Sequence, residues 1–373
     1  MAQPGNGSST DEPSAQQRAV TIRDVAAEAQ VSLGTVSNVL NRSIAVTPEK
    51  RQRVLDAIET LGYVKHAGAA LMRGGKAPTI GLVALDIRNP FFTELARGAE
   101  DAARENGRLL ILCNSDENAE QERGYLELLE EQRVLGVVIS PVDERNDTLQ
   151  WLRERGTAVV LLGRRRHDYC SVRVDDVTGG QLATDHLLDL GHRRLAYVTG
   201  PLSIDQYRER LKGVRRALRH RGLTEDSCQV IEVGTLGTAA EGQLASTRLR
   251  EQYPDVTGVT CGNDLLALGV VAGLISHGVG VPEEVSVVGF DDIEMAQQNP
   301  LPLTTIRQPK AELGWVATNL LLEEALRGAA HAHREVMFQP ELVVRATTRR
   351  VAGQGAPDPS ASDAGEAPSP PAT

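Results

Sequence analysis

The chain has 373 residues, which is too long for one small domain and suits two or three. Hydrophobic residues make up 41% of it and aromatic residues only 3%, so its cores must consist mainly of Ala, Val, Leu and Ile. The net charge of −10, taken alone, argues against nucleic-acid binding. A membrane span needs a run of about 18 apolar residues, and the sequence contains none.

The charge is unevenly distributed along the chain. Residues 18–76 carry nine Lys and Arg residues and five Asp and Glu residues, a local charge of about +4, so the remaining segments carry about −14. A small basic module on an acidic body is the asymmetry expected of a DNA-binding head attached to a sensor domain.

The terminal segments and the cysteines indicate in which cellular compartment the protein is located. Residues 1–18 and 351–373 are rich in small and polar residues and are expected to be disordered tails. The first tail lacks the apolar segment of a signal peptide. No Cys-x-x-Cys pair occurs among the four cysteines, Cys113, Cys170, Cys228 and Cys261. We therefore expect a cytoplasmic protein with free thiols and with no metal ion or cofactor.

Three short helices are predicted after the first tail. Thr21 followed by Asp24 forms a capping-box pattern, and Ser32 is the N-cap candidate of the second helix. Thr47-Pro48-Glu49 begins the third helix, and Gly62 ends it. Helical spacing predicts that the buried positions are Ile22, Val25, Val31, Val36, Val39, Leu40, Val54, Leu55, Ile58 and Leu61.

The first two helices flank a short turn around Gln30-Val31, as in a helix-turn-helix, whose second helix enters the major groove. With Val36 buried, this helix exposes three candidates for base contacts, Leu33, Gly34 and Asn38, and asparagine can pair with adenine. The candidates for phosphate contacts are Thr21, Ser32, Thr35, Asn41, Arg42 and Arg51. On this pattern alone, a helical docking module with a solvated polar face is the alternative.

From Pro78 onward, short apolar runs alternate with helical stretches. The runs are Ile80–Leu85, Leu109–Leu112, Val137–Ile139, Ala158–Leu162, Leu195–Val198, Val256–Cys261 and Val285–Phe290. Continuous apolar strands between helices predict parallel sheets that are covered on both faces. We expect two Rossmann-like α/β lobes that bind a ligand at the carboxyl ends of their strands.

Residues 21–41, TIRDVAAEAQVSLGTVSNVLN, resemble the head of the lactose-repressor family of bacterial transcription regulators, and VTPEKRQRVLDAIETLGY continues the likeness. The resemblance extends from about residue 20 to residue 350. It implies a sequence-specific regulator, most commonly a repressor, in which Leu33, Gly34 and Asn38 read bases. It also implies a homodimer, or a higher oligomer, on a near-palindromic operator. Residues 92–106 are expected to contribute to the dimer surface.

In this family, a hinge helix that orders only on operator DNA would occupy residues 66–75, within an expected hinge segment 65–77. The minor-groove residues that the resemblance implies are Leu71, Met72 and Arg73, with Met72 as the apolar wedge. Gly68 and Ala70 depart from the family pattern N-A-x-A-R-x-L-R-x-G. A flexible linker is the alternative for this segment.

The remaining sequence resembles the family's sensor domain, which shares its fold with periplasmic sugar-binding proteins. The matching segments are Asn89–Phe92, Tyr207–Arg210, Cys261–Asp264, Val288–Asp291 and Leu303–Pro309. The effector-binding residues that follow are Asn89, Phe91, Phe92, Arg164, Arg210, Asn263, Asp291 and Gln308. Charged and amide groups suit sugar hydroxyls, and a phenylalanine suits the C–H face. Because no aromatic occurs at Thr235-Leu236-Gly237, a non-sugar effector stays open.

These patterns predict a definite domain organisation. The head should span residues 19–64, and the effector-binding and dimerisation domain residues 78–350. Lobe 1 should comprise residues 78–175 and 308–338, and lobe 2 residues 176–306 and 340–350. The expected lobe crossovers are Val174–Asp176, Thr304-Thr305 and Gln339-Pro340.

Two other functional classes fit less well. A sugar-binding protein of a transport system would need a leader and would not need the head. An enzyme is not expected, because no G-x-G-x-x-G follows the first strand and no P-loop or nucleophile elbow occurs. His331-Ala332-His333 is the only close histidine pair, and residues two apart on a helix do not share a face.

Overall fold

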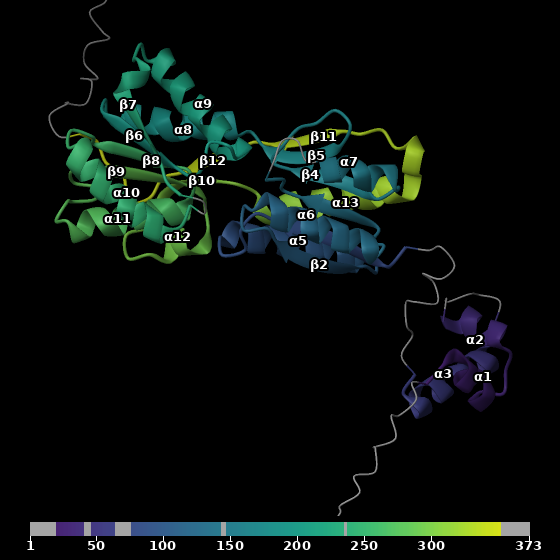
Figure 1. Cartoon of the computed structure of the whole chain (residues 1–373). Helices are drawn as coiled ribbons and strands as arrows, with labels where there is room; N and C mark the ends of the chain where they lie inside the picture. Colours follow the sequence, from purple (N-terminus) through teal and green to yellow (C-terminus); the bar gives the residue numbers. More distant parts are fainter. Residues whose placement is uncertain (1–19, 41–45, 64–75, 143–146, 235–236, 352–373) are drawn as a thin grey trace, which may run out of the picture. The chain divides into compact units, whose positions relative to one another are not determined.

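The computed structural model describes residues 20–40, 46–63, 76–142, 147–234 and 237–351. The chain divides after Gly75 into two compact units, which we call the head and the body (Figure 1). Some predictions lie outside the described residues: the two tails except Val351, most of the hinge with Leu71, Met72 and Arg73, the two phosphate candidates Asn41 and Arg42, and Thr235 with Leu236.

The head contains three described helices around a small apolar core. They are α1 (Ile22–Glu28), α2 (Leu33–Leu40) and α3 (Pro48–Leu61). The fully buried core side chains are Val25, Ala26, Ala29, Val36, Val39, Val54 and Ala57. The expectation for Leu55 was wrong, because its side chain is 47% exposed. Successive helical residues point about 100° apart, so the buried stripe of α3 continues from Val54 to Ala57 instead.

The predicted caps of the head helices are present. The Asp24 carboxylate accepts hydrogen bonds from the backbone N–H of Thr21 at 2.8 Å and from its hydroxyl at 2.7 Å. The Ser32 hydroxyl accepts a bond from the backbone N–H of Thr35 at 3.2 Å. Gly62 ends α3 at a φ of 61°, a left-handed conformation that favours glycine.

The described part of the body contains two six-stranded sheets. The sheet of lobe 1 has the order β11-β5-β4-β3-β1-β2, and all neighbours in it are parallel. Its strands are β1 (Thr79–Ala84), β2 (Leu109–Asn114), β3 (Gly136–Ile139), β4 (Ala158–Leu162), β5 (Cys170–Val174) and β11 (Glu335–Phe338).

The sheet of lobe 2 has the order β12-β10-β9-β8-β6-β7. Its strands are β6 (Leu195–Thr199), β7 (Cys228–Glu232), β8 (Gly258–Cys261), β9 (Ser286–Asp291), β10 (Thr304–Arg307) and β12 (Glu341–Val343). All neighbours are parallel except β12, which pairs antiparallel with β10. The seven predicted apolar runs all overlap strands, and the antiparallel edge strand was not expected.

Helices cover both faces of each sheet, as Figure 1 shows. In lobe 1 they are α5 (Pro90–Glu105) and α13 (Lys310–Arg327) on one face, and α6 (Ala119–Glu131) and α7 (Asp147–Glu154) on the other. In lobe 2 they are α8 (Asp176–Asp189) and α9 (Asp205–His220) on one face, and α10 (Ala239–Gln252) and α11 (Asp264–Ser276) on the other. The short helix α12 (Glu294–Gln298) follows β9, and the 3₁₀ turns η1 (Glu225–Ser227) and η2 (Gly328–Ala330) precede β7 and β11.

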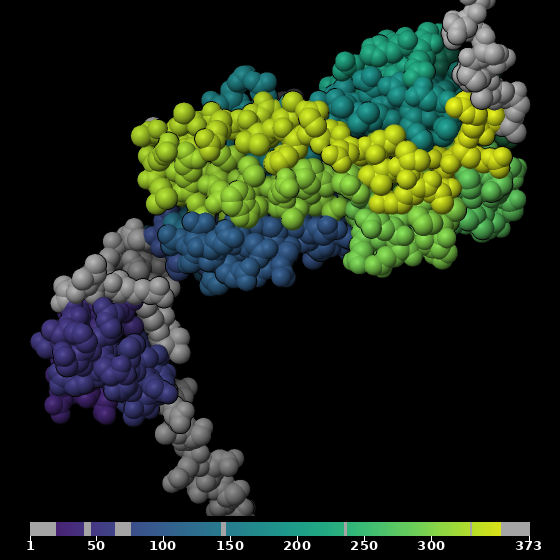
Figure 2. All heavy atoms as spheres, turned by 180° about the vertical axis from the view of Figure 1, so that it is seen from behind, coloured from purple at the N-terminus to yellow at the C-terminus, as the bar shows by residue number. Residues whose placement is uncertain are grey.

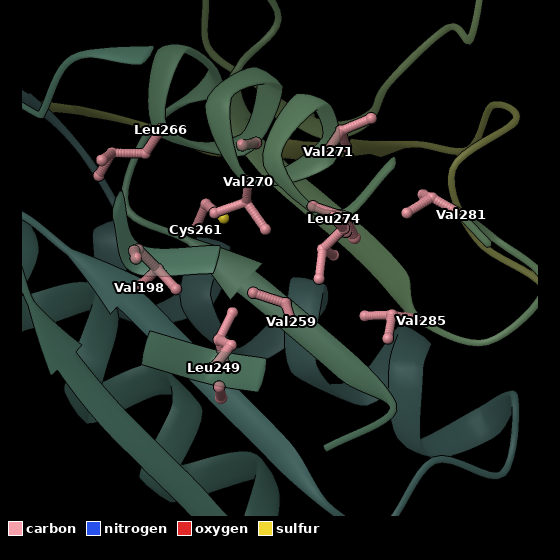
Figure 3. Close-up of a cluster of buried hydrophobic side chains, with 14 of the residues drawn as sticks. Val198, Leu249, Val259, Cys261, Leu266, Val270, Val271, Leu274, Val281 and Val285 are labelled. Carbon is pink, nitrogen blue, oxygen red and sulfur yellow. The ribbon is translucent and has the colours of Figure 1, made fainter. Parts of the chain in front are cut away.

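Small and branched aliphatic residues fill the cores, as the composition predicts. Figure 3 shows the lobe 2 cluster under α10 and α11, where Val198, Val259 and Leu274 pack around Cys261. The fully buried members of this cluster are Ala, Val, Ile, Leu and Cys. All four cysteines are free and buried.

Paired glycines bring three pairs of helices into backbone contact. A Cβ added at Gly98 of α5 would lie 1.9 Å from the carbonyl oxygen of Ala311, and one added at Gly314 of α13 would lie 2.0 Å from that of Leu95. The same reciprocal arrangement joins α8 to α9 and α10 to α11 through Gly180 with Gly213 and Gly242 with Gly269. Only glycine permits such close approach.

The chain passes three times between the lobes, at Val174–Asp176, Gln308–Pro309 and Gln339-Pro340. The expected crossover at Thr304-Thr305 was wrong, because both residues lie inside β10 of the lobe 2 sheet. Figure 2 shows the C-terminal segments, drawn in yellow, extending along both lobes. Among the described residues, no helix has the length and apolar character that a membrane crossing requires.

Candidate DNA interface and effector cavity

The exposed face of α2 carries the residues predicted to read bases. Leu33 is 46% exposed, and Gly34 and Asn38 are exposed beside it. Val36 and Val39 point the opposite way into the head core, so packing fixes which face the helix presents. A Cβ at Gly34 would have only the Ser32 hydroxyl near it, at 3.7 Å, so the backbone surface here is open.

The described candidates for phosphate contacts lie near the N-termini of the three head helices. Thr21 and Ser32 use their hydroxyls in the capping bonds of α1 and α2. Thr35 lies one turn into α2, its hydroxyl 2.9 Å from that of Ser32, and Arg51 is half-buried on α3. These side chains can position the head on a DNA backbone without reading its sequence.

The body contains a cavity lined by residues of both lobes. Its space, including the open mouth, is about 650 Å³. Seven of the eight predicted effector residues line it: Asn89, Phe91, Phe92, Arg210, Asn263, Asp291 and Gln308. They come from the carboxyl ends of strands and the first two turns of the helices that follow, which is where α/β proteins hold ligands.

Asp291, at the end of β9, accepts hydrogen bonds across the cavity wall. Its Oδ1 accepts from the Gln308 amide at 2.6 Å, and its Oδ2 accepts from the Asn89 amide of lobe 1 at 3.2 Å. Burial raises the pKa of Asp291 to about 6, although the charge of Arg210 and these hydrogen bonds favour the carboxylate. Its φ of 123° is costly for a residue with a side chain, and such strain is typical of functional sites.

Arg210 is a buried cation held in a fixed orientation. Its Nε donates to the Asp176 carboxylate at 2.8 Å, and its Nη1 donates to the carbonyl of Gly262. The guanidinium lies 3.6 Å from the centre of the Phe290 ring, which supports its plane. This arrangement leaves a preoriented donor group at the cavity wall.

Asn89 and Asn263 each cap a helix with one side-chain atom and face a partner with the other. The Oδ1 of Asn89 accepts from the backbone N–H of Phe91 at 3.0 Å, and that of Asn263 accepts from the backbone N–H of Leu266 at 2.8 Å. The Nδ2 of Asn263 donates to the Tyr207 hydroxyl at 3.3 Å. The capping bonds thus fix which polar atoms face the cavity.

The cavity also has an apolar side. Phe91 and Phe92 contact each other edge to face, with ring centres 5.0 Å apart and planes at 87°. Leu85 and Phe92 of lobe 1 pack against Ile204 and Tyr207 of lobe 2, so an apolar contact joins the lobes beside the cavity. Aromatic faces next to fixed polar groups suit a ligand with both C–H and hydroxyl surfaces.

The structure does not place Arg164 at the cavity, contrary to expectation. This residue is buried, and its guanidinium forms an ion pair with Asp205 at the start of α9. Arg164 therefore bridges β4 of lobe 1 to lobe 2 instead of lining the cavity. The partner that redirects it lies far away in sequence.

Sequence reasoning missed several lining residues, including Glu117, Ser140, Arg173, Asp176 and Gln206. Ser140 directly follows β3 and Asp176 follows β5, so their positions after strands were an available signal. Gln206 Nε2 lies 3.4 Å from the Ser140 hydroxyl across the lobes. Burial raises the pKa of Glu117 to about 8, which makes it a hydrogen-bond donor at neutral pH.

Comparison with known proteins gives two matching family models. Residues 21–66 match bacterial regulatory proteins of the lacI family. Residues 77–350 match the model described as periplasmic binding proteins and sugar binding domain of the LacI family. The two models together span nearly all of the described chain.

Individual proteins resemble the whole chain. It is 33% identical over 332 residues to the transcriptional repressor PurR of Photobacterium profundum, covering 88% of this chain and 98% of that protein. A solved complex of the transcriptional regulator CelR with cellobiose is 31% identical, with a TM-score of 0.66, and covers 88% of this chain and 99% of that one. The lac repressor dimer bound to operator and the anti-inducer ONPF is 25% identical, with a TM-score of 0.78, covering 89% and 100%. The chain therefore belongs to the lactose-repressor family of bacterial transcription regulators and is a DNA-binding regulator rather than an enzyme.

Proposed function

We propose that this protein is a dimeric repressor whose operator affinity is controlled by a sugar-like effector bound between its lobes. The observation that carries the DNA-binding part is the exposed face of α2, with Leu33, Gly34 and Asn38 outward while Val36 and Val39 are buried. We assign DNA binding to residues 19–64, DNA-dependent hinge ordering to residues 65–77, and effector binding and dimerisation to residues 78–350. In the hinge, the minor-groove role of Leu71, Met72 and Arg73 stays a prediction. Because a regulator of this family must reach DNA to act, we place the protein in the cytoplasm.

The chemistry of the cavity supports a polyhydroxylated effector. Asp291 and Asp176 accept hydrogen bonds, Arg210 donates them, and amides such as Asn89 do both. The ring of Phe91 or Phe92 offers a surface for a C–H face. Two relatives solved with sugars, the CelR complex with cellobiose and an Enterococcus faecium regulator with bound ribose, have the same fold.

The outer surface of lobe 1 supports a dimer of this chain. Leu109, Ile111 and Leu112 of the edge strand β2 are exposed. With Ala96 and Arg97 of α5, residues of β2 line a shallow hollow on this side. An apolar edge strand exposed to water is a liability unless another surface covers it, and a second copy matches the two-fold symmetry of a palindromic operator.

The geometry supports a direct path from the cavity to this surface. Asn89, whose side chain donates to Asp291, is the N-cap of α5, and Gln308, which also donates to Asp291, lies two residues before the start of α13 at Lys310. A ligand that changes these contacts displaces the first turns of both helices. We expect an effector coupling of about 1–3 kcal/mol on operator binding, with an inducer favouring the DNA-free state and a corepressor the DNA-bound state.

Two measurements on the purified full chain test this function. Selection from random duplexes should yield a near-palindromic site bound with salt-dependent affinity. A thermal-shift screen of sugars, sugar phosphates and nucleobases should find a ligand that raises the Tm, by the equivalent of about 2.7 kcal/mol at 100 times its Kd. Binding of no duplex in preference to others would contradict the proposal.

A matched pair of variants locates the effector. Asp291→Ala should abolish the shift caused by the ligand from the screen and leave operator affinity intact. Asp255→Ala, which removes an exposed acid of the same lobe that pairs with Arg194, should keep the shift. A full shift in Asp291→Ala would remove this residue from the site.

A further inference from the structure

A second cluster of reactive side chains lies in lobe 1, outside the lining of the effector cavity. Cys170 begins β5, Glu324 lies in the last turns of α13, and His331 and His333 lie in the segment between η2 and β11. One potential ligand atom from each of the four lies within 4.8 Å of all the others. Cys170 is completely buried and Glu324 is 8% exposed.

Several polar atoms of this cluster are buried without a hydrogen-bond partner among the described residues. Two of them, Glu324 Oε2 and His333 Nδ1, are atoms that could bind an ion; the third is the Nδ1 of His331, whose Nε2 faces Cys170 Sγ. Glu324 Oε2 lies 3.7 Å from His333 Nδ1, which is too long for a hydrogen bond. Buried polar atoms that lack partners are costly, so three of them within this cluster of four residues need an explanation.

We propose that Cys170, Glu324, His331 and His333 bind a zinc ion. Zinc prefers sulfur, imidazole nitrogen and carboxylate oxygen ligands in a tetrahedral arrangement. Its bond lengths of about 2.0–2.3 Å place ligand atoms about 3.3–3.8 Å apart. The observed separations of 3.1 Å between Cys170 Sγ and His331 Nε2, and 3.7 Å between His333 and Glu324, are close to that range.

The charge balance supports a divalent cation. A thiolate from Cys170 and a carboxylate from Glu324 together neutralise two positive charges, so the buried complex is neutral. Binding of the metal displaces the thiol proton.

Sequence reasoning overlooked the two histidines because it assumed a helix. On a helix, residues two apart point to different faces, but His331 has an extended backbone with φ −77° and ψ 131°. The segment from His331 to β11 is not helical. The other two ligands come from elements far away in sequence, so no local spacing indicated the site.

The position of the cluster indicates a structural role. Four protein ligands fill a tetrahedral shell and leave no open position for a substrate. The site would fasten the segment after α13 to the first residue of β5, next to the pairing of β5 with β11. β11 is one of the two edge strands of the lobe 1 sheet and leads into the third crossover to lobe 2. Zinc would therefore stabilise the edge of lobe 1 where the chain leaves it.

The test uses cobalt as a spectroscopic substitute for zinc in the purified full chain. After treatment with a chelator, titration with Co²⁺ should saturate at one ion per chain. The complex should show the intense visible bands of tetrahedral cobalt and a thiolate-to-metal charge-transfer band. Addition of Zn²⁺ should remove both signals and raise the Tm. Absence of saturable Co²⁺ and Zn²⁺ uptake by the wild-type protein would overturn the proposal.

A pair of cysteine variants identifies the sulfur ligand. Cys170→Ser should lose the charge-transfer band, whereas Cys113→Ser, a buried thiol of β2 in the same lobe, should keep it. The opposite pattern would contradict the assignment. Should Cys170→Ser fail to fold, His333→Ala is the second test, because this side chain is partly exposed. It should weaken zinc binding at least roughly 10–100-fold, the loss typical of removing a mere supporting residue, and an unchanged affinity would refute the site.

Discussion

Replacing Asn38 by alanine tests the DNA-reading face most directly. Asn38 is exposed on α2, while Val36 and Val39 on the opposite side are buried in the head core. Alanine is the better helix former by up to about 0.7 kcal/mol, and the N-cap at Ser32 is untouched. Asn38→Ala should therefore leave the head folded, with a Tm unchanged or slightly raised, so a loss of affinity reports on DNA contact.

The size of the loss follows from the contact that is removed. A two-bond contact between asparagine and adenine contributes about 1–3 kcal/mol of base discrimination, which is about 5- to 160-fold in affinity. A dimer presents α2 to both half-sites, so a symmetric operator should lose about 2–6 kcal/mol. Because asparagine is uncharged, the salt dependence should not change, whereas Arg51→Ala should reduce the salt slope by about 1 per half-site.

The assay is fluorescence anisotropy with the selected operator and all of its single-base variants, at several salt concentrations. The wild-type protein should discriminate at a symmetric pair of positions where Asn38→Ala does not. An equal loss on every variant, or no loss at all, would show that Asn38 does not read a base. A change in salt slope would indicate displacement of the whole head instead.

Three further predictions concern pH, packing and assembly. Burial raises the pKa of Asp264 to about 7, above its ordinary 3.8, so the folded state retains a proton that the unfolded state loses. Stability should therefore fall between pH 6 and pH 8 in denaturant titrations, and this fall should be about 1 kcal/mol smaller in Asp264→Asn than in the wild type. Gly98→Ala should destabilise the body by roughly 1–3 kcal/mol or more, whereas Gly124→Ala, where a Cβ meets nothing within 4 Å, should stabilise it by about 0.5–1 kcal/mol; equal effects in calorimetry would refute the packing argument. Leu112→Glu should yield monomers in sedimentation experiments while Leu128→Glu, at an exposed leucine of α6, should not, and a dimeric Leu112→Glu protein would exclude β2 from the interface.

The sequence predicted strands where burial on both faces makes a run apolar. The strands it missed were β5, β7, β10, β11 and β12, of which β7, β11 and β12 lie at sheet edges. Edge strands are partly exposed, so polar residues interrupt them, as in CQVIE of β7. The edge strand β2 was predicted only because its exposed side is apolar, with Leu109 at 68% exposure.

Local sequence patterns predicted those cavity residues whose position depends only on the strand next to them. Residues at or just after the ends of strands, such as Asp291 and Asn263, meet at the cavity because parallel strands end at the same sheet edge. What sequence could not reveal was long-range pairing. Arg164 is engaged by Asp205, and Cys170 meets Glu324 and the histidines only because the sheet aligns β5 with β11.

The glycine contacts between α5 and α13 bear on how a displacement at the cavity would pass through lobe 1. At Gly98 and Gly314, the main chains of α5 and α13 touch with no side chain between them that could change rotamer and absorb a displacement. Both helices start at the cavity wall, so we expect a bound ligand to displace them together. We therefore expect a displacement at Asn89 or Gln308 to reach the outer surface of lobe 1, which is the proposed contact with a second subunit.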